Sequence, residues 1–193
     1  MIMKKLHSNI ASTLFEIASM TATALTLIVF LYIFIFRITT VSGNSMYPTL
    51  SDGDRLVISS SQSDYEYKDI VIIVQPGVLN EPLVKRVIAT GGQWVNVDYD
   101  KGVVYVGNSA ENMITLNEDY IFEPATEHNF DDTYEYPVQV PDGMLFVMGD
   151  NRNNSTDSRS YMVGFIDESY VLGKVTYRIW SEDKGLEFFS VNK

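Results

Sequence analysis

The feature that most constrains this chain is an apolar run near its N-terminus, from Ile17 to Phe36, with no charged side chain over twenty residues. At ~1.5 Å per residue, a helix of that length spans the ~30 Å hydrocarbon core of a bilayer. A cleavable signal peptide is the alternative, but its apolar region usually has ~7–15 residues and ends at a small-x-small site, which residues 34–37 do not offer. The run therefore predicts a transmembrane helix over residues 17–36.

The charges that flank this run predict its orientation. Lys4 and Lys5 precede it, and a long acidic region follows it. Positive charge favours the cytoplasmic side, although Arg37 just beyond the span opposes this bias. We expect a single-pass protein of the cell membrane, with residues 1–16 in the cytoplasm and residues 38–193 outside it.

Composition limits what the region after the span can do. It holds roughly 155 residues, which is the size of one domain with a substantial core. The whole chain has 25 acidic and 14 basic residues and a formal charge of -11, so most of its surface repels nucleic acid. It has no cysteine, which excludes disulfides, thiolate zinc sites and a cysteine nucleophile.

The region after Arg37 reads as β-rich. Short runs of β-branched and aromatic residues begin at positions 55, 69, 82, 144 and 170 and are separated by Gly, Pro, Asp and Ser. Residues 93–99 and 103–108 flank Asp100-Lys101-Gly102 and predict a β-hairpin, because Gly102 can adopt the positive φ of a short turn. The expected fold class is a mainly β domain behind one N-terminal helix.

A serine protease needs a base, and the histidines are poorly placed to supply one. His7 precedes the span and His128 lies in an acidic stretch, so a Ser-His-Asp triad fits badly. A buried lysine can instead be neutral and accept a proton. Lys85 stands in the run "PLVKRVIA", where alternation places Leu83, Lys85 and Val87 on one strand face. An exposed edge lysine is the open alternative.

The segment Gly149 to Ser160, "GDNRNNSTDSRS", is too polar for an ordinary hairpin tip. A calcium loop fails on spacing, because Ser155 stands where the loop needs glycine and Tyr161 where it needs glutamate. The remaining hydroxyls and amides, with Asp157 and Arg159, are suited to locking a loop that orients a lysine.

Four segments together resemble one family, the type I signal peptidases of bacteria, in their short single-anchor form. They are "SGNSMYPTL", "GDRLVI", "DIVIIV" with "KRVIATGG", and "VMGDNRNNSTDSR", in this order behind the apolar run. The resemblance implies a β-rich Ser/Lys peptidase fold similar to that of self-cleaving repressors. It also implies cleavage of signal peptides from secreted preproteins, with no cofactor and no metal.

The resemblance assigns roles to individual residues. Ser45 resembles the nucleophile and Lys85 the general base. Ser155 matches a hydroxyl that hydrogen-bonds the lysine amine, and Asp157 with Arg159 matches a pair that shapes the site. Gly43 stands where many relatives carry a serine that helps to bind the oxyanion, so the sequence names no second donor beside the Ser45 N–H.

The position of Ser45 also fits this function. The nine residues from Phe36 reach at most ~30 Å, so Ser45 stays near the membrane surface, where a signal peptide emerges. Val41, Met46, Leu50 and Val84 are expected to wall a shallow pocket that accepts alanine, and a plain core role is equally open for them.

Two other functions use the same features. A self-cleaving repressor-type protease shares the Ser/Lys chemistry, but the anchor and the lack of a helical DNA-binding domain oppose it. A non-catalytic, membrane-anchored binding or pilus-assembly module has no need of both Ser45 and Lys85. The expected partners of the peptidase are signal peptides and the lipid bilayer. Contact with the protein export machinery is compatible with these two partners.

Overall fold

The computed structural model describes residues 2–59, 64–75, 81–127, 134–181 and 184–190. The chain divides into two compact units, Met1–Arg37 and Ile38–Lys193. The first unit is formed by helix α1 (Ile2–Ile35), which begins well before the predicted start because no Gly or Pro interrupts it. Its segment Ser12–Phe30 is long and apolar enough to cross a membrane.

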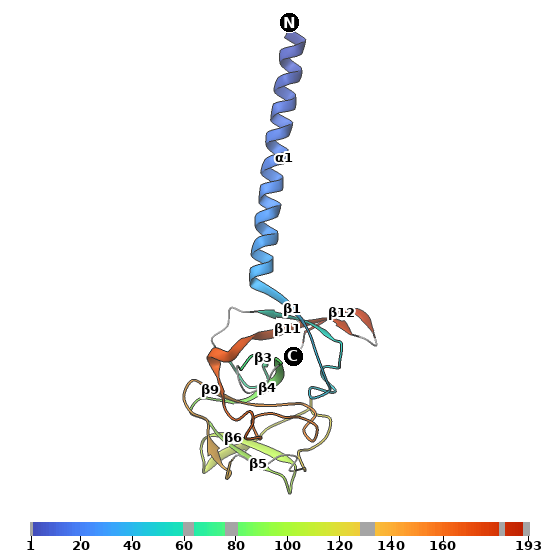
Figure 1. The fold of residues 1–193 in the computed structure, drawn as a ribbon. Coiled ribbons are helices and arrows are strands. Elements are labelled where there is room, and N and C mark those ends of the chain that lie inside the picture. Colours follow the sequence, from blue (N-terminus) through green and yellow to red (C-terminus); the bar gives the residue numbers. More distant parts are fainter. Residues whose placement is uncertain (1, 60–63, 76–80, 128–133, 182–183, 191–193) are drawn as a thin grey trace. The chain divides into compact units, whose positions relative to one another are not determined.

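The second unit contains two sheets, and the predicted mainly β fold is confirmed (Figure 1). In the larger sheet the strand order is β1-β2-β11-β3-β4-β9-β10, with β12 paired to β11. These strands are β1 (Phe36–Thr40), β2 (Arg55–Ser59), β3 (Ile70–Ile73), β4 (Leu83–Thr90), β9 (Met144–Met148), β10 (Ile166–Asp167), β11 (Val171–Ser181) and β12 (Gly185–Ser190). A 3₁₀ turn, η1 (Glu168–Tyr170), precedes β11.

The smaller sheet has the order β7-β6-β5-β8 and lies apart from β11 in Figure 1. Its strands are β5 (Trp94–Asp98), β6 (Val103–Ser109), β7 (Asn112–Thr115) and β8 (Val138–Gln139). The predicted hairpin is confirmed: β5 and β6 pair antiparallel from Trp94↔Gly107 to Asp98↔Val103, and Gly102 has φ +68°.

Strand β4 is the structural centre of this unit, because it pairs with β3 on one side and β9 on the other. Its apolar residues alternate between clusters, as a strand requires. Leu83 and Val87 pack with the cluster that contains Leu145, whereas Val84 packs with the cluster that contains Met46. A charged residue in β4 is therefore surrounded by paired backbone and apolar side chains.

Candidate active site

Ser45 lies in a turn that is fixed at both ends. Before it, Val41 N–H donates to the Asp54 carbonyl at 2.8 Å, and Gly53 N–H donates to the Val41 carbonyl at 3.0 Å. At the serine itself, the Ser45 carbonyl accepts a hydrogen bond from Asn151 N–H at 3.0 Å. The polar segment 149–160 therefore holds the backbone that carries the Ser45 hydroxyl.

Lys85 reaches Ser45 from the middle of β4. Its residue surface is 2% exposed, so the edge-strand alternative is wrong. The amine Nζ lies 2.7 Å from Ser45 Oγ and 3.1 Å from the Val84 carbonyl oxygen. The two side chains that the sequence singles out, forty positions apart, thus meet at hydrogen-bond distance.

Burial changes the chemistry of this amine. Desolvation lowers the pKa of Lys85 from 10.5 to about 8, because a charged ammonium is poorly solvated here. The nearby charges of Asp157 and Asp150 act in the opposite direction, and the charge of Arg159 assists the lowering. At mildly alkaline pH much of the population therefore carries a neutral amine that can accept a proton from Ser45.

Asp157 and Arg159 form a buried ion pair in the segment after β9. Arg159 Nε and Nη2 each donate to one Asp157 carboxylate oxygen at 2.8 Å. Asp157 also accepts from Gly149 N–H at 2.9 Å, and Arg159 donates to the Arg152 carbonyl at 2.7 Å. Burial alone raises the pKa of Asp157, but the charge and hydrogen bonds of Arg159, aided by Gly149 N–H and Ser155, outweigh it, and the pKa lies below its ordinary value. The pair therefore stays ionised and locks the loop.

The expected hydrogen bond between Lys85 and Ser155 is not formed. Ser155 Oγ is buried and makes no hydrogen bond of good geometry to Lys85 or to any other described residue, although it lies close enough to Asp157 to help lower the pKa of that carboxyl. It packs against the backbone instead: a Cβ on Gly149 would come within 2.3 Å of Ser155 Oγ and 2.4 Å of the Ser45 carbonyl oxygen. Ser155 thus lies in the layer beside the nucleophile, and the Val84 carbonyl takes the second hydrogen bond of the amine.

The four expected pocket residues lie mainly in the core. Val41, Met46 and Leu50 are buried in one cluster, against which Val84 is partly buried. Val41, Met46 and Leu50, which flank Ser45 in sequence, anchor its turn by apolar contacts. Contact between these residues and substrate stays a prediction.

The backbone around Ser45 bears on the oxyanion. The Ser45 N–H has no hydrogen-bond partner among the described residues, and so it is available as a donor. Gly43 adopts φ +83°, and its N–H donates to Asp52 Oδ1 at 2.7 Å. The glycine that replaces a serine in this position therefore shapes the turn, and its own N–H is already engaged.

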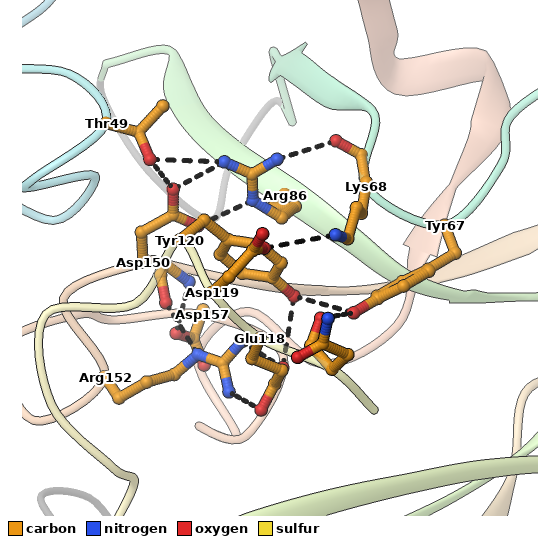
Figure 2. Close-up of polar contacts among 12 residues, drawn as sticks. Thr49, Tyr67, Lys68, Arg86, Glu118, Asp119, Tyr120, Asp150, Arg152 and Asp157 are labelled. Atoms are coloured by element: carbon orange, nitrogen blue, oxygen red, sulfur yellow. Dashed lines mark hydrogen bonds and ion pairs between the residues drawn. The ribbon is translucent and has the colours of Figure 1, made fainter. Parts of the chain in front are cut away.

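Sequence reasoning missed two further buried ion pairs, which Figure 2 shows. Arg86 contacts Asp150 through two hydrogen bonds of 2.8 and 2.6 Å, and Arg152 contacts Glu118 in the same two-pronged manner. The ring of Tyr120 lies 4.0 Å from the Arg86 guanidinium carbon. The charged Arg86 inside an apolar run was the available signal for the first pair. Glu118 lies in a polar loop, and no sequence signal indicated its pairing with Arg152.

Residue His7 belongs to the α1 unit, and His128 lies outside the described residues. Among the described residues, no group of three or more His, Cys, Asp or Glu side chains is arranged to hold a metal ion.

Comparison with known proteins identifies the family of this chain. The family model described as "Signal peptidase, peptidase S26" matches residues 14–180. The chain is 36% identical to a probable signal peptidase I-1 of Synechocystis over 81% of this chain and 78% of that protein. It is 38% identical to a signal peptidase I of Bacillus amyloliquefaciens over 72% of each chain. A solved signal peptidase I from Enterococcus faecalis aligns with 60% of this chain and all of that one, at 31% identity and a TM-score of 0.45.

The family model and the two sequence relatives establish the class and then the family. The protein is a serine endopeptidase, a hydrolase. Within that class, the chain belongs to the signal peptidase family, peptidase S26.

The lowered pKa of Lys85 has a consequence for folding. Between pH 8 and 10.5 the unfolded chain keeps the Lys85 proton while the folded chain releases it, so this residue makes stability rise with pH. Lys85→Met removes that titration. Between pH 8 and pH 10, the free energy of unfolding of the parent should rise by roughly 2 kcal/mol more than that of the variant.

The measurement is urea unfolding of the full-length protein in detergent at several pH values. Lys184→Met, which removes an exposed lysine, serves as the matched control and should leave the pH dependence unchanged. An equal pH dependence for the parent and Lys85→Met would contradict the lowered pKa.

Proposed function

We propose that this chain removes N-terminal signal peptides from exported preproteins, with Ser45 as nucleophile and Lys85 as general base. The observation that carries the proposal is the buried Lys85 amine 2.7 Å from Ser45 Oγ. The names of the matched relatives support the substrate class. A non-catalytic binding module is not favoured, because binding alone gives no reason to bury a lysine beside a serine.

In the first half of the reaction, neutral Lys85 takes the proton of Ser45 Oγ as this oxygen attacks the scissile carbonyl. The carbonyl oxygen becomes an oxyanion, to which the Ser45 N–H can donate. When the C–N bond breaks, the Lys85 ammonium gives its proton to the leaving amine. The mature protein departs and the signal peptide remains as an ester on Ser45.

In the second half, water takes the place of the leaving amine. Lys85 accepts a proton from the water as its oxygen attacks the ester, and then returns that proton to Ser45 Oγ. One lysine thus serves both steps, provided that its amine is neutral at the start of each. Asp157 and Arg159 act on this cycle indirectly, by fixing the segment that holds the Ser45 backbone.

The proposed topology has residues 1–16 in the cytoplasm, a span over residues 17–36 and the peptidase domain, residues 38–193, outside. Large apolar side chains are exposed on β1, at the edge of the larger sheet, and on β11 and β12: Ile38, Tyr177, Trp180, Leu186, Phe188 and Phe189. Strand β1 follows α1 directly in the chain, so these side chains suit contact with the lipid surface. Such a position also permits contact with the export machinery, which delivers preproteins at the same surface.

The first prediction of this function concerns the nucleophile. Ser45→Ala should abolish cleavage of a preprotein with an Ala-x-Ala site, because no other group in the site replaces Oγ. The circular dichroism of the variant should match the parent, since only one small atom is lost. Ser42→Ala removes an exposed hydroxyl three residues away and should stay within a few-fold of parental activity. Parental activity in Ser45→Ala would exclude the mechanism.

A second prediction concerns pH. With a pKa of about 8, the fraction of neutral Lys85 falls about tenfold for each pH unit below 7, and kcat/KM should fall with it. The profile should level off above pH 9. Lys85→Arg keeps the charge but cannot release its proton, and so it should be as inactive as Lys85→Ala.

The control is measured in the same pH-dependent cleavage assay. A His7→Ala, His128→Ala double variant should keep both the rate and the acid limb of the parent. Cleavage by Lys85→Arg, or an acid limb that disappears with the histidines, would reassign the base.

A third prediction concerns topology. Protease added outside intact protoplasts should digest the region beyond Arg37 and leave a tag placed before Lys4 intact. The opposite pattern would place the peptidase domain in the cytoplasm, away from emerging signal peptides, and would overturn the proposed function.

A further inference from the structure

Two aromatic side chains meet on the surface beside the nucleophile. Tyr47, two residues after Ser45, is 41% exposed, and Phe122, from the loop between β7 and β8, is 55% exposed. Their ring centroids are 5.0 Å apart, with an angle of 67° between the planes, which is an edge-to-face contact. Tyr47 Cα lies within ~7 Å of Ser45 Cα, because only two residue steps separate them.

Both rings are held by the backbone that builds the site. Tyr47 N–H donates to the Asn44 carbonyl at 3.1 Å, inside the turn that carries Ser45. Phe122 N–H donates to the Asp150 carbonyl at 3.2 Å. Asn151, which follows Asp150, donates through its backbone N–H to the Ser45 carbonyl at 3.0 Å. The buried ion pair between Arg86 and Asp150 fixes the residue that accepts the Phe122 hydrogen bond. The aromatic pair is therefore positioned by the same contacts as the Ser45 hydroxyl.

The exposure of this pair has no structural explanation within the unit. Its neighbours in sequence, Met46 and Leu50, are buried in the core, while Tyr47 points outward. The Tyr47 hydroxyl makes no hydrogen bond among the described residues, so the side chain serves no polar network there. Single exposed apolar residues are common, but two rings from distant segments that join beside a nucleophile form a preorganised apolar surface.

We propose that Tyr47 and Phe122 form a contact surface for the stretch of substrate polypeptide that flanks the Ala-x-Ala site and the first residue beyond the scissile bond, an inference that rests on the proposed function. Any peptide bond that Ser45 attacks must approach within a few ångströms of Oγ, and the flanking residues then pass over adjacent surface. Aromatic rings give large contact area at little entropic cost and need no particular partner side chain. Such a surface suits an enzyme whose substrates share only small residues at the cleavage site.

The test compares two peptides with full-length protein in detergent. The short peptide contains an Ala-x-Ala site and one residue beyond the scissile bond; the long peptide extends the same site by ten residues on each side. For Tyr47→Ala and for Phe122→Ala, kcat/KM for the long peptide should fall about tenfold, mainly through KM. For the short peptide it should change less than twofold. Tyr47→Phe keeps the ring and should retain parental values.

The matched control is Tyr170→Ala, which removes an exposed tyrosine ring from η1 and should affect neither peptide. Equal losses on both peptides, or parental values for both alanine variants, would overturn the contact surface. Losses that appear only with substrate in lipid vesicles would assign the rings to the membrane instead, and so would also overturn it. Failure of the proposed function is distinct, because the parent would then cleave neither peptide.

Discussion

The burial of the Lys85 amine beside Ser45 is the constraint on which the rest of the β unit depends. A charged amine in this position is poorly solvated, and the protein responds by lowering the pKa instead of supplying a direct anionic partner. Both of its contacts, Ser45 Oγ and the Val84 carbonyl, are neutral oxygens. A carboxylate at hydrogen-bond distance would hold the proton on the amine and remove the base. Asp150 and Asp157, the acidic groups whose charges act on the amine, are each engaged by an arginine instead.

This distribution explains why the site is surrounded by two-pronged arginine–carboxylate pairs. Arg86 with Asp150, Arg152 with Glu118 and Arg159 with Asp157 each neutralise a buried charge and fix two planar groups. Buried ion pairs contribute little net stability, since desolvation offsets much of their attraction. Their geometry is the more important contribution here, because they hold segment 149–160 against the Ser45 carbonyl without placing an unpaired charge beside Lys85.

The surface beside this rigid centre divides into regions of different character. Exposed apolar side chains lie on β11, β12 and β1, of which β1 directly follows the helix in the chain, and the Tyr47–Phe122 pair borders the nucleophile. Both regions gather exposed apolar side chains in one place, which is typical of contact sites. A protease that meets its substrate at a bilayer has two partners for such area, lipid and polypeptide, and neither is recognised by a defined side-chain sequence.

Much of the fold and of the site was already determined by local sequence. The uncharged run at 17–36 defines a helix of membrane length, short runs of β-branched and aromatic residues define strands, and Gly102 defines a turn, because each depends on neighbouring residues alone. The order of four segments identified Ser45 and Lys85. Tertiary structure decided the rest: that Lys85 is buried and not at an edge, that Ser155 packs without bonding the amine, and that Val41, Met46 and Leu50 belong to the core. It also decided that Glu118 meets Arg152 and that Phe122 meets Tyr47. These contacts join segments separated by 34 and 75 positions, and burial and ion pairing across such separations depend on how strands stack, which no local pattern encodes.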